Sequence, residues 1–418
     1  MAKTIELKRV VITGMGVVSP LGHEVHEFWQ NLLAGKNGID TITGFDTADF
    51  TTKFAGEIKD FSPEEFIDRK ESRRMDRFTQ FAVVAAGKAV KHSGIDFDNE
   101  DKDRIGVIVS SGIGGMQTFE QQSRTLIERG PRRISPFFIP MMITDIAPGQ
   151  ISIRYGLRGP NFSTVSACAS SSHAIGEAFR TIQRGDADVM LCGGSEATVS
   201  PMGIGGFNAM KALSTRNDEP QKASRPFDKH RDGFVMGEGG GIIILESLEH
   251  ALDRGAEIWS EVAGVGYTAD AHHITAPAPG GQGARFAMQK ALHDGDLVPG
   301  DIDYVNTHGT STPHGDIAET NAIKAVFGDH AYKMNINSTK SMIGHLLGAS
   351  GSVEFIVTTM SIKQDTVHPT INQEEPDPEC DLDYTANEYR KRSVRAAVSN
   401  SFGFGGHNVS IVVKKYQN

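Results

Sequence analysis

The sequence predicts an α/β fold built from two similar halves. Short strand-like runs rich in glycine and β-branched residues, such as VVITGMG, RIGVIVSSGIGG and DVMLCGGSEA, alternate with longer segments of helical pattern. Four of these elements recur in the same order in the second part of the chain. The chain has 418 residues, enough for one large unit or two fused domains. We therefore expect an N-terminal half over residues 1–255 and a C-terminal half over residues 256–418, tightly fused as one unit.

The recurring elements pair off along the chain. VVITGMGVVSP is echoed by EVAGVGYTAD, and RIGVIVSSGIGG by DYVNTHGTSTPHG. NFSTVSACASSSHAIGEA is echoed by NINSTKSMIGHLLGASG, and DVMLCGGSEA by AVSNSFGFGGHN. The third pair carries Cys168 and His345, so we expect these residues at equivalent helix starts, brought together by a pseudo-twofold axis. Chance similarity among glycine-rich strand ends is the alternative interpretation.

Composition excludes several classes of protein. The formal charge of -10 disfavours nucleic acid and anionic membranes as general partners. No apolar run approaches the roughly 18 to 20 residues of a membrane span. The three cysteines are widely separated and form no CxxC, which predicts reduced thiols in the cytoplasm. No H-x3-H or HExxH pattern predicts a metal site, and TGMGVVSPLG lacks the third glycine of a dinucleotide fingerprint.

Cys168 is the first candidate for chemistry. A β-rich approach gives way at this cysteine to a helical pattern, and a helix N-terminus stabilises a thiolate, so we expect a lowered thiol pKa. A buried structural cysteine is the alternative. The backbone N–H of Cys168 and a second from the loop NSFGFGGHN would form an oxyanion hole, with Phe402 and Phe404 beside the thiol. That loop is otherwise an ordinary glycine turn.

Two histidine motifs lie far downstream. His308 follows a predicted strand in NTHGTSTPHGD, where α/β sites gather, and His345 opens a helical segment in STKSMIGHLLGASG. A helix dipole keeps a histidine at its N-terminus neutral, and a neutral ring donates an N–H to a developing enolate. Lys340 either polarises this site or lies on the surface. Glu354, nine residues after His345, points to the opposite face of the same helix, and its spacing argues for no link to the site.

Basic residues cluster in RKESRRMDR, residues 69–77, and in ERGPRRIS. Each run is a solvated helix face or a docking surface for an acidic partner.

Together, SACASSSH, NTHGTSTPHGD, STKSMIGHLLGASG and NSFGFGGHN resemble the β-ketoacyl-[acyl carrier protein] synthases of the thiolase fold, in particular the elongating type II condensing enzymes. The resemblance spans nearly the whole chain. It implies two pseudo-repeated halves in a five-layered αβαβα sandwich and a homodimer. The implied reaction is decarboxylative condensation of an acyl chain with malonyl-[acyl carrier protein], with acyl carrier protein as partner. The implied enzyme needs no metal and no cofactor of its own, because the substrates carry the phosphopantetheine.

The resemblance also implies a role for each matching residue. Cys168 is the nucleophile, His308 and His345 stabilise the enolate, and Lys340 supports the histidines. The N–H groups of Cys168 and Phe404 form the oxyanion hole, and Phe404 gates the acyl pocket. The remaining implied roles are support by Glu354 and Phe402, contact with the phosphopantetheine arm by Thr275, Thr310 and Thr312, an acyl-pocket wall at Ile113, and carrier-protein docking at Lys70, Arg73, Arg74, Arg132, Arg133 and Lys211.

Four other functions stay open at this point. A type I β-ketoacyl synthase and a stand-alone polyketide ketosynthase share the motifs, although the bulky Ile113 favours type II. A polyketide chain-length factor keeps the fold but lacks the thiol. A papain-like cysteine hydrolase needs an asparagine partner and a CGSCW-like motif, neither of which the sequence provides.

Overall fold

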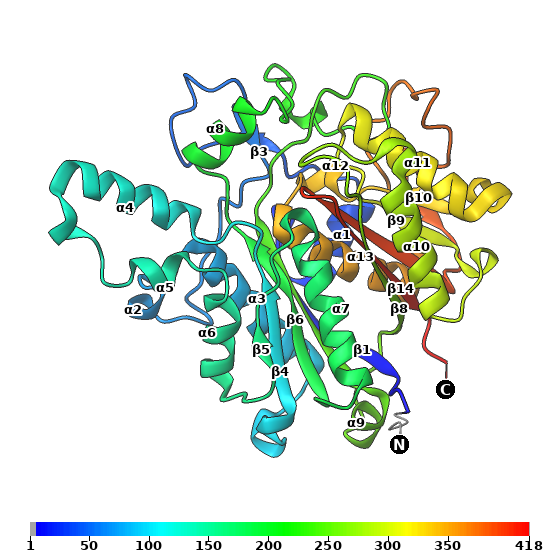
Figure 1. The fold of residues 1–418 in the computed structure, drawn as a ribbon, viewed down its shortest axis with the longest axis horizontal. Coiled ribbons are helices and arrows are strands. Elements are labelled where there is room, and N and C mark those ends of the chain that lie inside the picture. The colour runs from blue at the N-terminus through cyan, green and yellow to red at the C-terminus, as the bar shows by residue number, and fades with distance from the viewer. Residues whose placement is uncertain (1–5, 418) are drawn as a thin grey trace.

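The computed structural model describes residues 6–417, where ten strands form a mixed sheet of two matching halves (Figure 1). The strand order is β5-β4-β6-β7-β1 in one half and β10-β9-β13-β14-β8 in the other. In each half the first three strands are parallel and the last two pair antiparallel. The strands are β1 (Val10–Val18), β4 (Ile105–Ser110), β5 (Asn161–Phe162), β6 (Val189–Glu196), β7 (Gly239–Ser247), β8 (Ser260–Ala269), β9 (Tyr304–Asn306), β10 (Asn335–Asn337), β13 (Ala396–Gly403) and β14 (His407–Lys414).

This order confirms the predicted duplication. Each pair of recurring motifs occupies the same place in its half, because β1, β4, β5 and β6 correspond to β8, β9, β10 and β13. The halves join where β1 pairs antiparallel with β8. The predicted division after residue 255 lies between α9 (Leu248–Asp253) and β8. Two small pairs, β2 (Asp40–Thr41) with β3 (Phe54–Ala55) and β11 (Thr366–Val367) with β12 (Arg390–Lys391), lie outside the large sheet.

Two helices lie between the half-sheets. α7 (Ser170–Gln183) packs on β6 and β4 of its own half and reaches β14 of the other, and α13 (Ser350–Gln364) packs on both β13 and β7. Outside the sheets, α3 (Arg77–Ser93) and α6 (Ile146–Tyr155) cover the N-terminal half, and α10 (Gln282–Asp294) and α11 (Pro313–Phe327) cover the C-terminal half. The result is the expected five-layered αβαβα sandwich.

The central position of α13 explains its composition. Residues Ser350 to Ile362 are all buried, so this helix has no polar face. Its hydroxyl groups are satisfied within the helix, because Thr358, Thr359 and Ser361 each donate to the carbonyl four residues earlier. The outer helix α3 is delimited by its caps: it begins after the N-cap Asp76 and ends at Gly94, which has a left-handed φ of 64°.

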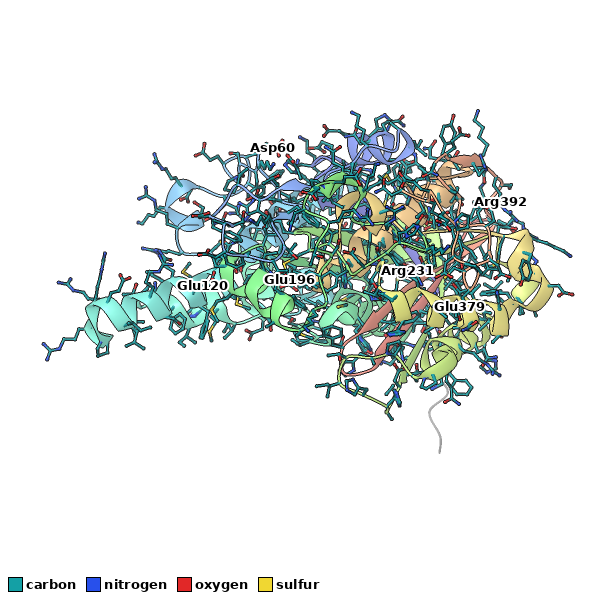
Figure 2. All side chains as sticks on the ribbon, turned by 90° about the horizontal axis from the view of Figure 1, so that it is seen from above. Asp60, Glu120, Glu196, Arg231, Glu379 and Arg392 are labelled. Carbon is teal, nitrogen blue, oxygen red and sulfur yellow. The ribbon has the colours of Figure 1, made fainter. Side chains whose placement is uncertain are left out.

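The remaining helices surround the sandwich. They are α1 (Val25–Leu33), α2 (Arg69–Ser72), α4 (Met116–Arg129), α5 (Phe138–Met142), α8 (Pro201–Ala209) and α12 (Lys340–Ile343). α4 projects away from the body, and only Thr118 of this helix is buried (Figures 1 and 2). No helix within residues 6–417 is both long and apolar enough to cross a membrane.

Candidate active site

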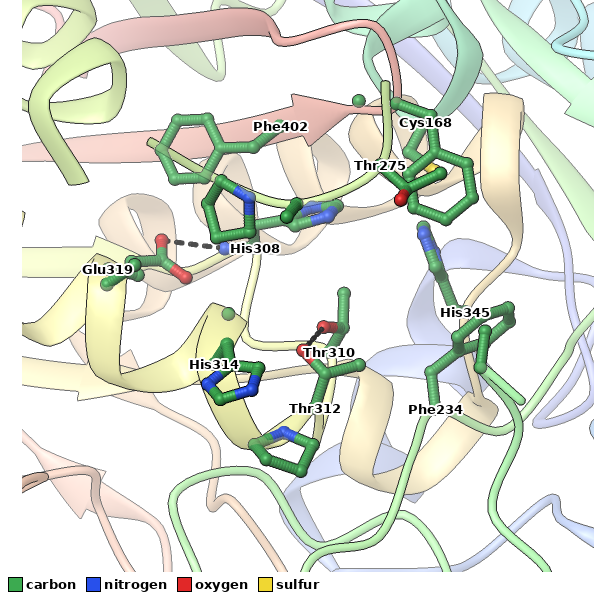
Figure 3. A pocket seen from close by; sticks show the side chains of 18 of the residues that line it. Cys168, Phe234, Thr275, His308, Thr310, Thr312, His314, Glu319, His345 and Phe402 are labelled. Atoms are coloured by element: carbon green, nitrogen blue, oxygen red, sulfur yellow. Dashed lines mark hydrogen bonds between the residues drawn. The ribbon is translucent and has the colours of Figure 1, made fainter. Parts of the chain in front are cut away.

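A cavity of about 440 Å³ opens where the two halves meet, and it contains Cys168, His308 and His345 (Figure 3). Cys168 comes from the N-terminal half and both histidines from the C-terminal half. The walls are mostly apolar, with Phe207, Phe234, Phe402 and Phe404 among the lining side chains. The fold therefore gathers three residues that lie up to 177 positions apart in the sequence, from 168 to 345.

Cys168 lies in a tight turn before the central helix. The turn Ala167–Ala169 leads directly into α7, and Ala167 adopts a left-handed φ of 52°. Ser170 holds this turn, because its Oγ accepts from the Ser166 N–H and donates to the Ala167 carbonyl. The thiol is thus held at a helix start, as the sequence predicts.

The predicted lowering of the thiol pKa is wrong. Cys168 is 7% exposed, and burial raises its pKa to about 12. The positive charge of Lys340 and the backbone N–H groups of Phe404 and Cys168 act in the opposite direction but do not overcome burial. The thiolate therefore needs stabilisation at the moment of reaction, and two N–H groups already face the sulfur.

His345 is not the structural counterpart of Cys168. The turn Leu347–Ala349 leads into α13 as Ala167–Ala169 leads into α7, and Leu347 has a left-handed φ of 47°. The residue equivalent to Cys168 is therefore Gly348. His345 lies before this turn, in a segment whose backbone bridges Met236. The prediction that Cys168 and His345 occupy equivalent helix starts is therefore wrong. His345 lies three residues before the equivalent position, because the turn Leu347–Ala349 separates it from α13.

His345 is held in one orientation. Its backbone N–H donates to the Val235 carbonyl at 2.7 Å, and its imidazole Nδ1 lies 2.8 Å from Ser350 Oγ. The Phe234 ring packs edge-on against the imidazole at 5.4 Å. Burial, then the charge of Lys340, lowers the His345 pKa well below its ordinary value. His345 is neutral, as predicted. The cause is burial and the Lys340 charge, and not the helix dipole that we expected.

His308 faces His345 across the cavity, with 5.2 Å between the ring centroids. Its Nδ1 is buried and has no hydrogen-bond partner among the described residues. The Glu319 carboxylate fixes the backbone, since it accepts from the N–H groups of His308 at 2.9 Å and Gly309 at 2.8 Å (Figure 3). Burial and the neighbouring Lys340 and His345 lower the His308 pKa well below its ordinary value.

Lys340 and Glu354 form a buried ion pair behind the histidines. The distance from Lys340 Nζ to Glu354 Oε1 is 2.6 Å, and each side chain is 1% exposed. The interpretation of Lys340 as a surface lysine is therefore wrong. Glu354 reaches the site through Lys340, a link that helical spacing from His345 did not predict.

The glycine loop after β13 closes over the cysteine turn. A Cβ on Gly403 would lie 2.5 Å from the Ser166 carbonyl oxygen and 3.2 Å from the Cys168 nitrogen, so only glycine allows this approach. Phe404 follows, with its ring 6.4 Å from that of Phe207. Phe402 lies 5.7 Å from the His308 ring.

Polar residues mark the other end of the cavity. Thr310 and Thr312 lie next to each other, with 3.0 Å between their hydroxyl oxygens (Figure 3). Lys211 and His314 also line the cavity, and Figure 3 shows Thr275 on the side of Cys168. His314 has no distinctive sequence context, and the structure places it on the wall.

The other predicted residues lie outside the cavity. Ile113 is 38% exposed and does not line it. Lys70 lies on α2, and Arg73 and Arg74 follow it, with the Arg74 guanidinium 4.7 Å from the Phe137 ring. Arg132 and Arg133 lie in the short turn after α4. Figure 1 shows α2 and α4 on the same side of the molecule, and Lys211 follows α8 and lines the cavity.

Glu319 and Ser350 are the site residues that sequence reasoning missed. Glu319 is buried on α11, and nothing in its local pattern, HGDIAET, indicates a contact with the backbone of His308. Ser350 lies only five residues after His345, so a search for hydroxyl partners near each histidine would have found it.

The chain matches both domains of one enzyme family. Residues 7–251 match the profile "Beta-ketoacyl synthase, N-terminal domain" and residues 259–374 match "Beta-ketoacyl synthase, C-terminal domain". The chain is 55% identical over 410 residues to a 3-oxoacyl-[acyl-carrier-protein] synthase 2 of Staphylococcus aureus (strain N315), covering 98% of this chain and 99% of that protein. It is 53% identical to the protein of the same name in Synechocystis sp. (strain ATCC 27184 / PCC 6803 / Kazusa), covering 99% of each.

Solved structures agree with this assignment. A β-ketoacyl synthase from Burkholderia phymatum STM815 superimposes with a TM-score of 0.92 at 38% identity, covering 98% of this chain and 100% of the other. A type II polyketide ketosynthase solved in complex with its acyl-carrier protein gives the same TM-score and coverage at 35% identity. By sequence, by fold and by the arrangement of its cavity, the chain belongs to the β-ketoacyl synthase family.

Proposed function

We propose that this chain catalyses the decarboxylative condensation of an acyl group, held on Cys168, with malonyl-[acyl carrier protein] to give 3-oxoacyl-[acyl carrier protein] in type II fatty acid elongation. The observation that carries the proposal is the cavity that holds one thiol opposite two buried histidines of lowered pKa. Two neutral imidazoles suit the stabilisation of an enolate. A hydrolase would instead need a base that activates water, and the lowered pKa of both histidines makes them weak bases.

In the first step the Cys168 sulfur attacks the acyl thioester carbonyl. The N–H groups of Cys168 and Phe404 stabilise the oxyanion, which is supported by their position at the sulfur. The oxyanion then collapses, the bond to the pantetheine sulfur breaks, and the thiol proton passes to that sulfur. The acyl chain stays on Cys168 as a thioester.

In the second step the malonyl thioester carbonyl binds between the histidines. With Ser350 donating its hydroxyl proton in a hydrogen bond to Nδ1 of His345, the imidazole carries its own proton on Nε2, and this N–H donates a hydrogen bond to the carbonyl oxygen. His308 donates in the same way. The bond to the malonyl carboxylate breaks, CO2 leaves, and its electron pair forms the enolate. The enolate carbon attacks the acyl thioester, and the Cys168 sulfur leaves and takes up one proton.

The partner is an acyl carrier protein, which delivers both substrates. Thr275, Thr310 and Thr312 contact the phosphopantetheine arm, which is supported by their place on the cavity wall. The site uses no metal and no cofactor of its own. We also assign the chain to the cytoplasm, which is supported by three free, buried cysteines.

We further propose that the chain forms a homodimer through α4 and the edge strand β5. α4 projects from the body with Ile127 84% exposed, and Phe162 of β5 and Val165 beyond it are also exposed. Exposed apolar side chains on a projecting helix and an open strand edge are both stabilised by a second copy of the same surface. In such a dimer the partner's surface would complete the acyl pocket next to Ile113.

The proposal is tested by condensation over a ladder of acyl-carrier primers with malonyl-carrier protein. The chain should form 3-oxoacyl product and release CO2 in equal amounts, and Cys168→Ala should form no acyl-enzyme by intact mass. Release of CO2 without condensation would instead indicate a chain-length factor. A preference for polyketide intermediates over saturated acyl primers would indicate a polyketide ketosynthase.

A further inference from the structure

A buried carboxylate lies between the two halves of the site and takes no part in the reaction proposed above. Glu196 is the last residue of β6, and its side chain is inaccessible to solvent. Figure 2 places it within the body of the molecule, on the side from which α4 projects. Burial raises the Glu196 pKa to about 7. Its hydrogen-bond partners among the described residues are all neutral N–H or O–H donors.

Both oxygens of this carboxylate are used. Oε1 accepts from Ser111 Oγ at 2.7 Å and from the Ile113 N–H at 3.3 Å. Oε2 accepts from the Gly112 N–H at 2.7 Å and from the Gly348 N–H at 3.0 Å. Three of these donors belong to the loop after β4 in the N-terminal half, and the fourth belongs to the C-terminal half. Glu196 therefore connects the two halves.

The two glycines lie in direct contact at this carboxylate. A Cβ on Gly348 would lie 2.2 Å from the Gly112 nitrogen, and a Cβ on Gly112 would lie 3.2 Å from the Ala167 carbonyl oxygen. The Gly112 backbone thus packs between two turns: Ala167–Ala169, which holds Cys168, and Leu347–Ala349, which follows His345. These backbones approach because neither glycine has a side chain and both N–H groups share one acceptor.

We propose that Glu196 is a positioning residue for the condensation step, setting the distance between the turn of Cys168 and the segment of His345. This inference rests on the proposed function. Gly348 lies between His345 and Ser350, which holds the His345 imidazole, so a displaced Gly348 turn displaces the ring. Condensation requires that ring beside the acylated sulfur, whereas acylation of Cys168 does not require it.

The test is Glu196→Gln in the full-length chain. A glutamine has one acceptor oxygen, so its NH2 group would face two N–H or O–H donors in place of an acceptor. We expect the condensation rate to fall about tenfold to a hundredfold, because a small misplacement of reacting groups has that effect. The rate of acyl-enzyme formation, followed by intact mass without malonyl substrate, should stay within about threefold of wild type.

Two variants serve as controls. Glu196→Asp keeps both acceptor oxygens, so it should recover part of the condensation rate that Glu196→Gln loses. Glu246 is a second fully buried carboxylate, on the neighbouring strand β7, where Arg254 and His250 donate to it at 2.6 Å each. Glu246→Gln should lower the melting temperature without changing the ratio of acylation to condensation.

The outcomes are distinguishable. If Glu196→Gln fails to fold, Ser111→Ala removes a single donor and should show the same selective loss to a smaller degree. Equal slowing of both steps, or no slowing, in a folded variant of either residue overturns the role of Glu196 while the wild-type reaction stands. Absence of condensation by the wild-type chain would instead reject the proposed function and the inference with it.

Discussion

The Lys340 ammonium lies 2.6 Å from a Glu354 carboxylate oxygen in the interior of the protein, and each side chain is 1% exposed. Burial is the main cause of the pKa shifts of Cys168, His308 and His345, and the Lys340 charge acts on all three, favouring a lower pKa in each. Glu354 neutralises it in turn. Lys340 thus adds to the effect of burial in keeping both imidazoles neutral, and Glu354 prevents an uncompensated charge beside them.

Removal of the lysine charge should affect stability and activity separately. Lys340→Met leaves Glu354 buried without its partner, which should lower the free energy of unfolding by about 3 to 5 kcal/mol in chemical denaturation. The histidine pKa values should rise, so the loss of decarboxylation on acidification should begin at a higher pH. Adding Glu354→Gln removes the unpaired carboxylate and should restore stability but not activity. Unchanged stability in the single variant would contradict a buried pair.

The thiol should react as a group of high pKa. Burial raises the Cys168 pKa to about 12, so the alkylation rate with iodoacetamide should rise about tenfold per pH unit up to pH ~10, without levelling off. Cys168→Ala provides the background from Cys192 and Cys380. A plateau between pH ~7 and ~9 would show that the helix start lowers the thiol pKa after all.

The histidines should matter more for condensation than for acylation. His308→Ala or His345→Ala removes an enolate donor but leaves the N–H groups at the sulfur in place, so acyl-enzyme should still form while condensation falls about a hundredfold or more. Quenched-flow measurement of both steps checks this. Equal loss of both steps would argue against the enolate role. Ser350→Ala should give a smaller loss in the same direction, because His345 then loses its orienting hydroxyl.

The basic residues after α2 should contribute to carrier-protein binding. Reversal of charge at Arg73 and Arg74 should raise KM for carrier-linked substrates by about tenfold and reduce the dependence of KM on salt. The matched control is Arg390→Glu, a half-exposed residue on β12, which should change neither value. An unchanged KM in the first variant would show that Arg73 and Arg74 are ordinary solvent-exposed residues with no role in carrier-protein binding.

Most of the fold was predictable because its signals are local. Strand runs, helix patterns and the order of repeated motifs depend on residues close in sequence, and β1, β4, β5 and β6 recur as β8, β9, β10 and β13. Cys168, His308 and His345 were predictable for the same reason, since each lies in a short, distinctive motif. The exact start of α13 was not, because the turn at Leu347 requires a left-handed residue that its side chain does not indicate.

The sequence by itself determined which three candidate residues meet in the cavity, Cys168, His308 and His345, and that two similar halves hold them. Only the tertiary structure decided their electrostatics and their supports. Burial reversed the expected shift of the Cys168 pKa, and folding brought Glu354 to Lys340, Glu319 to His308, and Glu196 to both glycine turns. These effects depend on desolvation and on contacts between distant segments. Neither quantity is a property of a residue and its sequence neighbours.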